Sequence, residues 1–140
     1  MNRKHFIRAG CMLCIGMMLP IHDVVANAKT KKYKASLVDG TLTVPLAEIA
    51  DDNMLILKNK ELEFNILLIR KEGEFKALQM MCTHEGVPVT LSGETMHCSA
   101  HGSRFDFDGN VLQEPALKPL IQYEVSLNNN SILINTTKSK

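Results

Sequence analysis

Tryptophan is absent from this chain of 140 residues, and aromatic residues make up only 5% of it. The formal net charge is +1, so the chain lacks the basic surplus typical of nucleic-acid binding, and few aromatics are present to stack on bases. Four cysteines are too few for a disulfide-built scaffold of this length. With 45% hydrophobic and 22% charged residues, the composition is that of one ordinary globular domain.

The first 28 residues differ from the rest of the chain. Three basic residues among the first eight precede an uncharged run of eleven, residues 9–19, and an Ala-Asn-Ala sequence ends at Ala28. This order is typical of a secretory signal peptide. Eleven apolar residues are too few to span a bilayer core about 30 Å thick. A retained membrane anchor that ends near residue 28 is the alternative interpretation.

Residues 2–8 also resemble a twin-arginine signal, with Lys4 in place of the second arginine. That route exports proteins already folded around a cofactor. We therefore expect export to the periplasm or to the outer face of the cytoplasmic membrane. The mature chain would be residues 29–140, with 13 basic and 14 acidic residues and a net charge of −1.

Short apolar or alternating segments, separated by turn residues, make up the mature chain. No segment of twelve or more residues has the helical period. The Asn-rich stretch 128–130 predicts a hairpin, because asparagine tolerates positive φ angles. The sequence therefore predicts an all-β fold, an antiparallel sandwich or barrel. The strand candidates are residues 42–44, 54–58, 61–70, 75–81, 121–127 and 132–135.

Every cysteine and histidine of the mature chain lies between positions 82 and 101. The arrangement is Cys82-Thr83-His84, then thirteen residues, then Cys98-Ser99-Ala100-His101. Two thiolates and two imidazoles can bind one zinc ion tetrahedrally, or a [2Fe–2S] cluster in which two histidines replace two cysteines on one iron. A four-cysteine cluster would need two more cysteines than the mature chain has.

The residues around these ligands resemble the Rieske [2Fe–2S] family over about 40 residues. The matching positions are residues 82–86, 98–106, 108–111, 115–116 and 119–120. The resemblance implies that Cys82 and Cys98 bind the inner iron of a Rieske-type cluster, and that His84 and His101 bind the outer one. It also implies that the Ser103 hydroxyl donates a hydrogen bond to a cluster sulfide, which would raise the reduction potential.

The resemblance further implies the Rieske β architecture, with a small cluster-binding subdomain at about residues 78–116. The base would use approximately residues 33–77 and 117–137. His97 matches no ligand position, so we expect a structural role for it. We expect Met80 and Met81 to pack in the core.

Several positions depart from the quinol-oxidising members found in cytochrome bc complexes. Val87 and Ala100 stand where those members have two cysteines, so the disulfide between their cluster loops cannot form here. Phe105 stands where they have a tyrosine that donates to a cysteine ligand. The usual glycine before Pro115 is Glu114. We therefore expect a reduction potential below that of the quinol-oxidising type.

These observations favour electron transfer, by a small exported carrier or by a subunit of a membrane or periplasmic oxidoreductase. The donor would be a quinol or a redox protein, and the electron would pass to a downstream acceptor. Membrane association would come through residues 1–28 or through a membrane complex. One alternative is a Rieske-type ferredoxin of an oxygenase system, and another is a zinc-stabilised binding module. We expect no stand-alone enzyme, because no nucleophile–base pair, phosphate loop or flavin motif is present.

Overall fold

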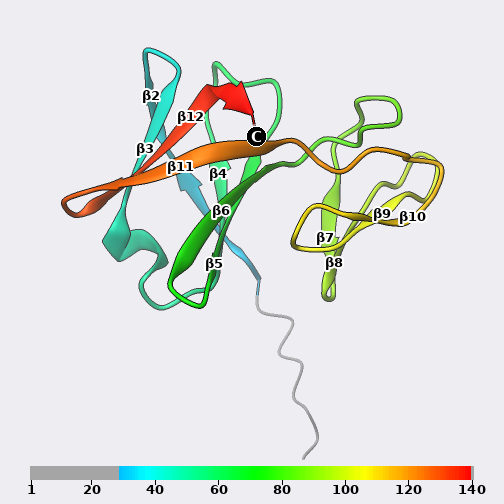
Figure 1. The fold of residues 1–140 in the computed structure, drawn as a ribbon, viewed down its shortest axis with the longest axis horizontal. Coiled ribbons are helices and arrows are strands. Elements are labelled where there is room, and N and C mark those ends of the chain that lie inside the picture. The colour runs from blue at the N-terminus through cyan, green and yellow to red at the C-terminus, as the bar shows by residue number, and fades with distance from the viewer. Residues whose placement is uncertain (1–28, 140) are drawn as a thin grey trace, which may run out of the picture.

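The computed structural model describes residues 29–139. The proposed signal peptide, residues 1–28, lies outside the described part of the chain. The described residues form two β-sheets and one short 3-10 turn, η1 (Leu46–Ile49), which confirms the predicted all-β fold class (Figure 1). None of their helical segments is long and apolar enough to cross a membrane.

The larger sheet has eight strands in the order β1-β4-β5-β6-β11-β12-β3-β2. Its neighbouring strands are antiparallel except for β1 and β4, which are parallel. The two edge strands, β1 and β2, are separated only by Ala35, so the sheet curls into a nearly closed barrel (Figure 1). Its strands are β1 (Lys31–Lys34), β2 (Ser36–Val38), β3 (Thr41–Pro45), β4 (Met54–Lys58), β5 (Ile66–Lys71), β6 (Glu74–Gln79), β11 (Gln122–Asn128) and β12 (Ser131–Ser139).

The smaller sheet is formed between β6 and β11 and lies to one side of the barrel in Figure 1. It has four strands in the order β10-β9-β8-β7. The chain leaves the barrel at the end of β6 and returns to it at the start of β11, which pairs with β6. The strands are β7 (Thr90–Ser92), β8 (Thr95–His97), β9 (Arg104–Phe105) and β10 (Val111–Gln113).

Strand β5 separates two hydrophobic cores. Its first four residues, Ile-Leu-Leu-Ile, are all buried. Ile66 and Leu68 point into the barrel, whereas Leu67 and Ile69 pack on the other side against the smaller sheet. A strand that is buried on both faces needs a continuous apolar run rather than an alternating one. The uninterrupted run at 66–69 is therefore the reason that the smaller sheet can pack against the outside of the barrel.

The predicted strand at 61–70 is wrong in its first half, because β5 begins only at Ile66. The side chain of Asn59 accepts a hydrogen bond from the Glu61 backbone N–H at 2.7 Å, which turns the chain immediately after β4. The predicted hairpin at 128–130 is confirmed. β11 and β12 pair up to Asn128 and Ser131, and Asn129 has the positive φ of 49° that the turn requires.

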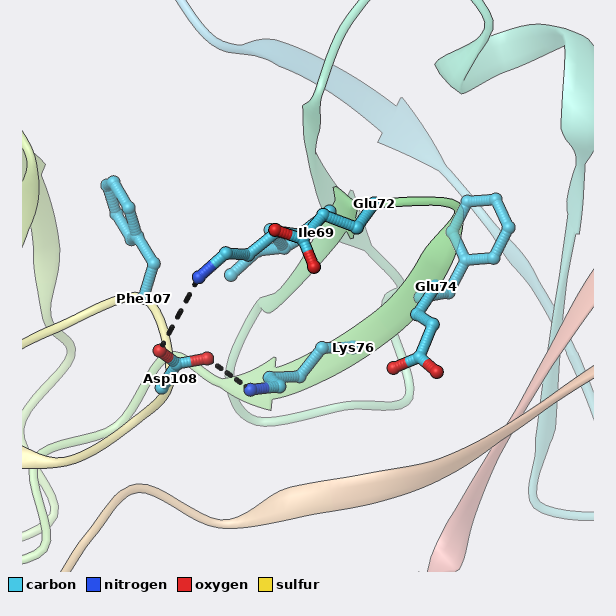
Figure 2. A pocket seen from close by; sticks show the side chains of 8 residues that line it. Ile69, Glu72, Glu74, Lys76, Phe107 and Asp108 are labelled. Atoms are coloured by element: carbon cyan, nitrogen blue, oxygen red, sulfur yellow. Dashed lines mark hydrogen bonds and ion pairs between the residues drawn. The ribbon is translucent and has the colours of Figure 1, made fainter.

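Charged side chains also join the two halves of the molecule. Asp108 lies in the turn between β9 and β10, and its carboxylate accepts a hydrogen bond from Lys76 of β6 and lies 4.0 Å from Lys71 of β5 (Figure 2). A cleft of about 220 Å³ lies beside these groups, between Phe75 and Phe107. The next residue, Gly109, has a φ of 87°, and a Cβ there would lie 3.1 Å from Leu78. The turn therefore packs tightly against the barrel.

Candidate metal centre

Two loops carry the predicted metal ligands. The first connects β6 to β7 and contains Cys82 and His84, and the second connects β8 to β9 and contains Cys98 and His101. Each cysteine is 1% exposed and lies in the core that the smaller sheet shares with the outside of the barrel. Neither of them forms a disulfide with another described residue. The fold thus holds two predicted soft ligands inside the protein, 16 residues apart in sequence.

The backbones of the two loops have the same hydrogen-bond pattern. Cys82 donates to Val87 O at 2.7 Å, and Gly86 donates to Cys82 O at 2.9 Å. Cys98 donates to Ser103 O at 2.9 Å, and Gly102 donates to Cys98 O at 3.0 Å. Gly86 and Gly102 have φ angles of 68° and 84°, a region that only glycine adopts without strain. The glycine that ends each motif, Gly86 or Gly102, therefore closes its loop around a cysteine.

The two imidazoles lie at the surface. Both His84 and His101 are exposed, and their ring centroids are 5.1 Å apart with the rings nearly perpendicular. A carboxylate oxygen of Glu85 lies 3.6 Å from His101 Nδ1. No role for Glu85 beyond its place in the motif was predicted from the sequence. The two loops therefore bring both imidazoles, which are 17 residues apart in sequence, to one exposed edge.

The distribution of the four ligands bears on which metal they can hold. Within residues 29–139, one group of three potential ligand side chains lies close enough to hold a single ion. It consists of His84, Glu85 and His101, and it leaves out both cysteines. A tetrahedral Cys2His2 zinc site would need all four donors around one ion. A Rieske cluster instead assigns the cysteines to one iron and the histidines to the other, so buried thiols with exposed imidazoles fit the cluster better.

A third segment contacts both ligand loops. The buried Ser103 hydroxyl accepts a hydrogen bond from the Ala116 N–H at 3.0 Å, which leaves its own hydrogen to donate elsewhere. The Thr83 hydroxyl donates to the Lys118 carbonyl at 2.6 Å. Residues 116–118 therefore connect to the second loop through a buried side chain and to the first loop through a half-buried one. The roles of Thr83 and Lys118 were not predicted, since they depend on a contact between residues 35 positions apart.

Four other residues that were singled out from the sequence are not predicted metal ligands. Phe105 is fully buried and offers no hydrogen-bond donor. His97 is half-buried on β8, between strand partners Thr90 and Arg104. Met80 is buried in the second core, as expected, whereas Met81 is only half-buried and pairs with Pro88.

Comparison with known families decides the identity of the domain. Residues 41–124 match the Rieske [2Fe-2S] domain. The chain belongs to the Rieske family. The resemblance found in the sequence is thereby confirmed, and so are the Rieske-type [2Fe–2S] cofactor and the electron-transfer function.

Relatives of this Rieske protein include a cytochrome b6-f complex subunit and a plasma membrane Rieske protein of known structure. The cytochrome b6-f complex iron-sulfur subunit of Chlorobaculum thiosulfatiphilum is 29% identical over 131 residues, which cover 90% of this chain and 68% of the relative. The plasma membrane Rieske protein PetC3 from Synechocystis PCC 6803 superposes with a TM-score of 0.53 and 26% identity. That match covers 64% of this chain and 93% of PetC3.

A second kind of neighbour shares the fold. In a complex of oxygenase and ferredoxin from carbazole 1,9a-dioxygenase, the matching chain superposes with a TM-score of 0.54 at 20% identity. The match covers 74% of this chain and 98% of that one. At this identity the likeness concerns the β architecture alone.

Proposed function

We propose that this Rieske protein is an exported electron carrier, or a subunit of a membrane-associated oxidoreductase. The observation that carries the proposal is the pairing of two buried thiols with two exposed imidazoles on matching loops. Cys82 and Cys98 would hold the inner iron, and His84 and His101 the outer one. The cluster-binding subdomain would extend over about residues 78–116.

When bound, the cluster supplies a one-electron couple, and the residues of the chain determine its surroundings. The apolar core around the cysteines excludes water from the inner side, which affects the potential. The Ser103 hydrogen would stabilise the reduced, more negative form by donating to a sulfide. The exposed His84 and His101 edge gives a partner the shortest approach, so we assign electron entry and exit to it.

Export and membrane association are supported by separate observations. Residues 1–28 have the order of a signal peptide, with a retained anchor as the alternative. Two relatives are named for a cytochrome b6-f complex and a plasma membrane. We therefore place the protein at the periplasmic side of the cytoplasmic membrane, with a quinol or a redox protein as donor and a second redox protein as acceptor.

A Rieske-type ferredoxin of an oxygenase system is the second candidate. Phe105 provides no hydroxyl near the second loop, and Val87 and Ala100 provide no loop disulfide, which lowers the expected potential. The proposed signal peptide opposes this role, because such ferredoxins usually work in the cytoplasm.

An EPR-monitored redox titration of the cluster-loaded protein tests the proposal and separates the candidates. A Rieske signal with a positive midpoint supports a quinol-linked subunit, and a midpoint near the lower family bound of about −150 mV supports the ferredoxin role. Bound zinc without iron would contradict both. As a further check, Phe105→Tyr should raise the midpoint, because it adds a donor.

A further inference from the structure

A lysine-lined depression lies at one end of the barrel, outside the metal centre. Its volume is about 480 Å³, and three lysines and one glutamate give it a local charge of +2. Residues 29–140 as a whole carry a net charge of −1, so positive charge is concentrated here. The lining residues are Lys34, Ala35, Lys58, Asn59, Lys60, Glu61 and Asn65.

The backbone holds the three lysines in place. Lys34 and Lys58 are register partners on the neighbouring strands β1 and β4, an arrangement that costs free energy because like charges repel. Lys60 follows in the turn that Asn59 fixes, since the Asn59 side chain donates to Ala35 O at 2.9 Å and accepts from the Glu61 N–H. No acidic side chain of the described residues forms an ion pair with any of these three lysines. Their charges are therefore available to an outside group.

The depression borders the part of the molecule that carries the metal ligands. The carbonyl of Asn65, one of its lining residues, accepts a hydrogen bond from the Met80 N–H at 2.9 Å, two residues before Cys82. β4 and β6 run in the same direction, each antiparallel to β5. The depression at the end of β4 and the first ligand loop after β6 are therefore at the same end of the barrel, as the strands in Figure 1 show.

From this placement we propose that the lysine depression docks an acidic redox partner of the proposed electron-transfer site. Positive charge beside a redox centre attracts a partner of opposite charge and speeds its association. A protein surface fits better than an anionic membrane for two reasons. The surface is hollowed, which suits protruding carboxylates, and its lining includes no large apolar side chain that could insert among lipids. The inference rests on the proposed function, because the partner exchanges electrons with the cluster.

A fluorescently labelled deca-glutamate peptide serves as the acidic probe, titrated at low ionic strength against the cluster-loaded protein. Lys60→Glu should weaken its binding about tenfold, and Lys60→Gln should weaken it less, because one attraction is lost without a new repulsion. Arg70→Glu is the matched control. Arg70 is exposed on β5, about 16 Å along the strand from Asn65, and the substitution changes the charge equally. It should alter the affinity less than twofold.

The peptide should also slow one-electron oxidation of the reduced protein by hexacyanoferrate(III), since it adds negative charge at the end of the barrel where the first ligand loop begins. Equal peptide affinities in Lys60→Glu and Arg70→Glu would overturn the docking surface. So would Lys60-dependent binding to phosphatidylglycerol vesicles without peptide binding, which would indicate a membrane surface instead. EPR of the same samples distinguishes the two proposals. A normal Rieske signal with no peptide effect removes only the docking surface, whereas a missing signal in the unsubstituted protein removes the electron-transfer role.

Discussion

The two ligand loops share a backbone but are anchored differently to the segment that contacts them both. Each has a cysteine N–H donating five residues ahead and a glycine donating back to the cysteine carbonyl. The second loop contacts Ala116 through the buried Ser103, whereas the first contacts Lys118 through the half-buried Thr83, whose hydrogen bond is exposed. The two loops thus have the same backbone hydrogen bonds but different side-chain hydrogen bonds to residues 116–118. The repeated backbone thus places both cysteines in the same way, whereas only the second loop has a buried side chain hydrogen-bonded to residues 116–118.

The largest expected effect tests the symmetry of the ligand set. Cys82→Ser and Cys98→Ser should each abolish cluster binding, because each cysteine supplies one of only two thiolates in residues 29–140. Iron content and the EPR signal measure the loss. His97→Ala should keep both at the unsubstituted level, since His97 lies on β8 and matches no ligand position. A full cluster in either cysteine variant would show that the loops are not equivalent.

The next largest effect tests whether the hydrogen bonds of Ser103 and Thr83 to residues 116–118 differ in their contribution. Ser103→Ala leaves the buried Ala116 N–H without its acceptor, which should cost about 1–3 kcal/mol of unfolding free energy. It should also lower the midpoint potential, by about 60 mV for a hydrogen bond worth about 1.4 kcal/mol in a one-electron couple. Urea denaturation and a redox titration measure the two quantities. Ser103→Thr, which keeps a hydroxyl, is the control for the potential.

Thr83→Val is the counterpart in the first loop. Its hydrogen bond is exposed, so water can replace it, and we expect a loss below about 1 kcal/mol. The midpoint potential of Thr83→Val should equal that of the Ser103→Thr control within experimental error. A stability loss as large as that of Ser103→Ala would show that the hydrogen bonds of Thr83 and Ser103 contribute equally.

The loop glycines offer a test of the shared backbone. Gly86→Ala and Gly102→Ala should each cost about 1–2 kcal/mol, because both residues have left-handed φ angles. Nothing nearer than 3.8 Å would meet either new Cβ, so the cost should come from the backbone. Gly→Asn at the same positions should cost less, since asparagine tolerates this conformation. Urea midpoints measure the series, and clearly unequal alanine costs would contradict the shared loop geometry.

The smallest effect lies outside the loops, at the turn of Asp108. The hydrogen bond from Lys76, with the charges of Lys76 and Lys71, lowers the pKa of Asp108 from its ordinary value of 3.8. A lowered folded-state pKa contributes stability above the ordinary value, and the contribution is lost as the pH falls through the lowered pKa. The difference in urea midpoint between the unsubstituted protein and Asp108→Asn should therefore be present at pH 7 and shrink toward pH 3. Asp51→Asn, which removes an exposed carboxylate with no ion pair among the described residues, is the control.

The sequence allowed prediction of features that are local or that form a contiguous motif. The Rieske motif and the hairpin at 128–130 belong to this group, because each depends on residues close together in sequence. The prediction of a strand at 61–70 was wrong in its first half, because the Asn59 side chain turns the chain before β5. The bond from Thr83 to Lys118 and the pair of Lys76 with Asp108 join residues more than 30 positions apart. No periodicity encodes such contacts, so they required the folded structure.

The double burial of β5 has a consequence for protein engineering. Leu67 and Ile69 belong to the barrel by sequence, yet they support the layer in which both cysteines lie. A cluster-binding segment transplanted onto another barrel would lose this support unless the host supplied an equivalent apolar outer wall. The transferable module is therefore larger than the segment between β6 and β11, and it includes the outward-facing residues of its host strands.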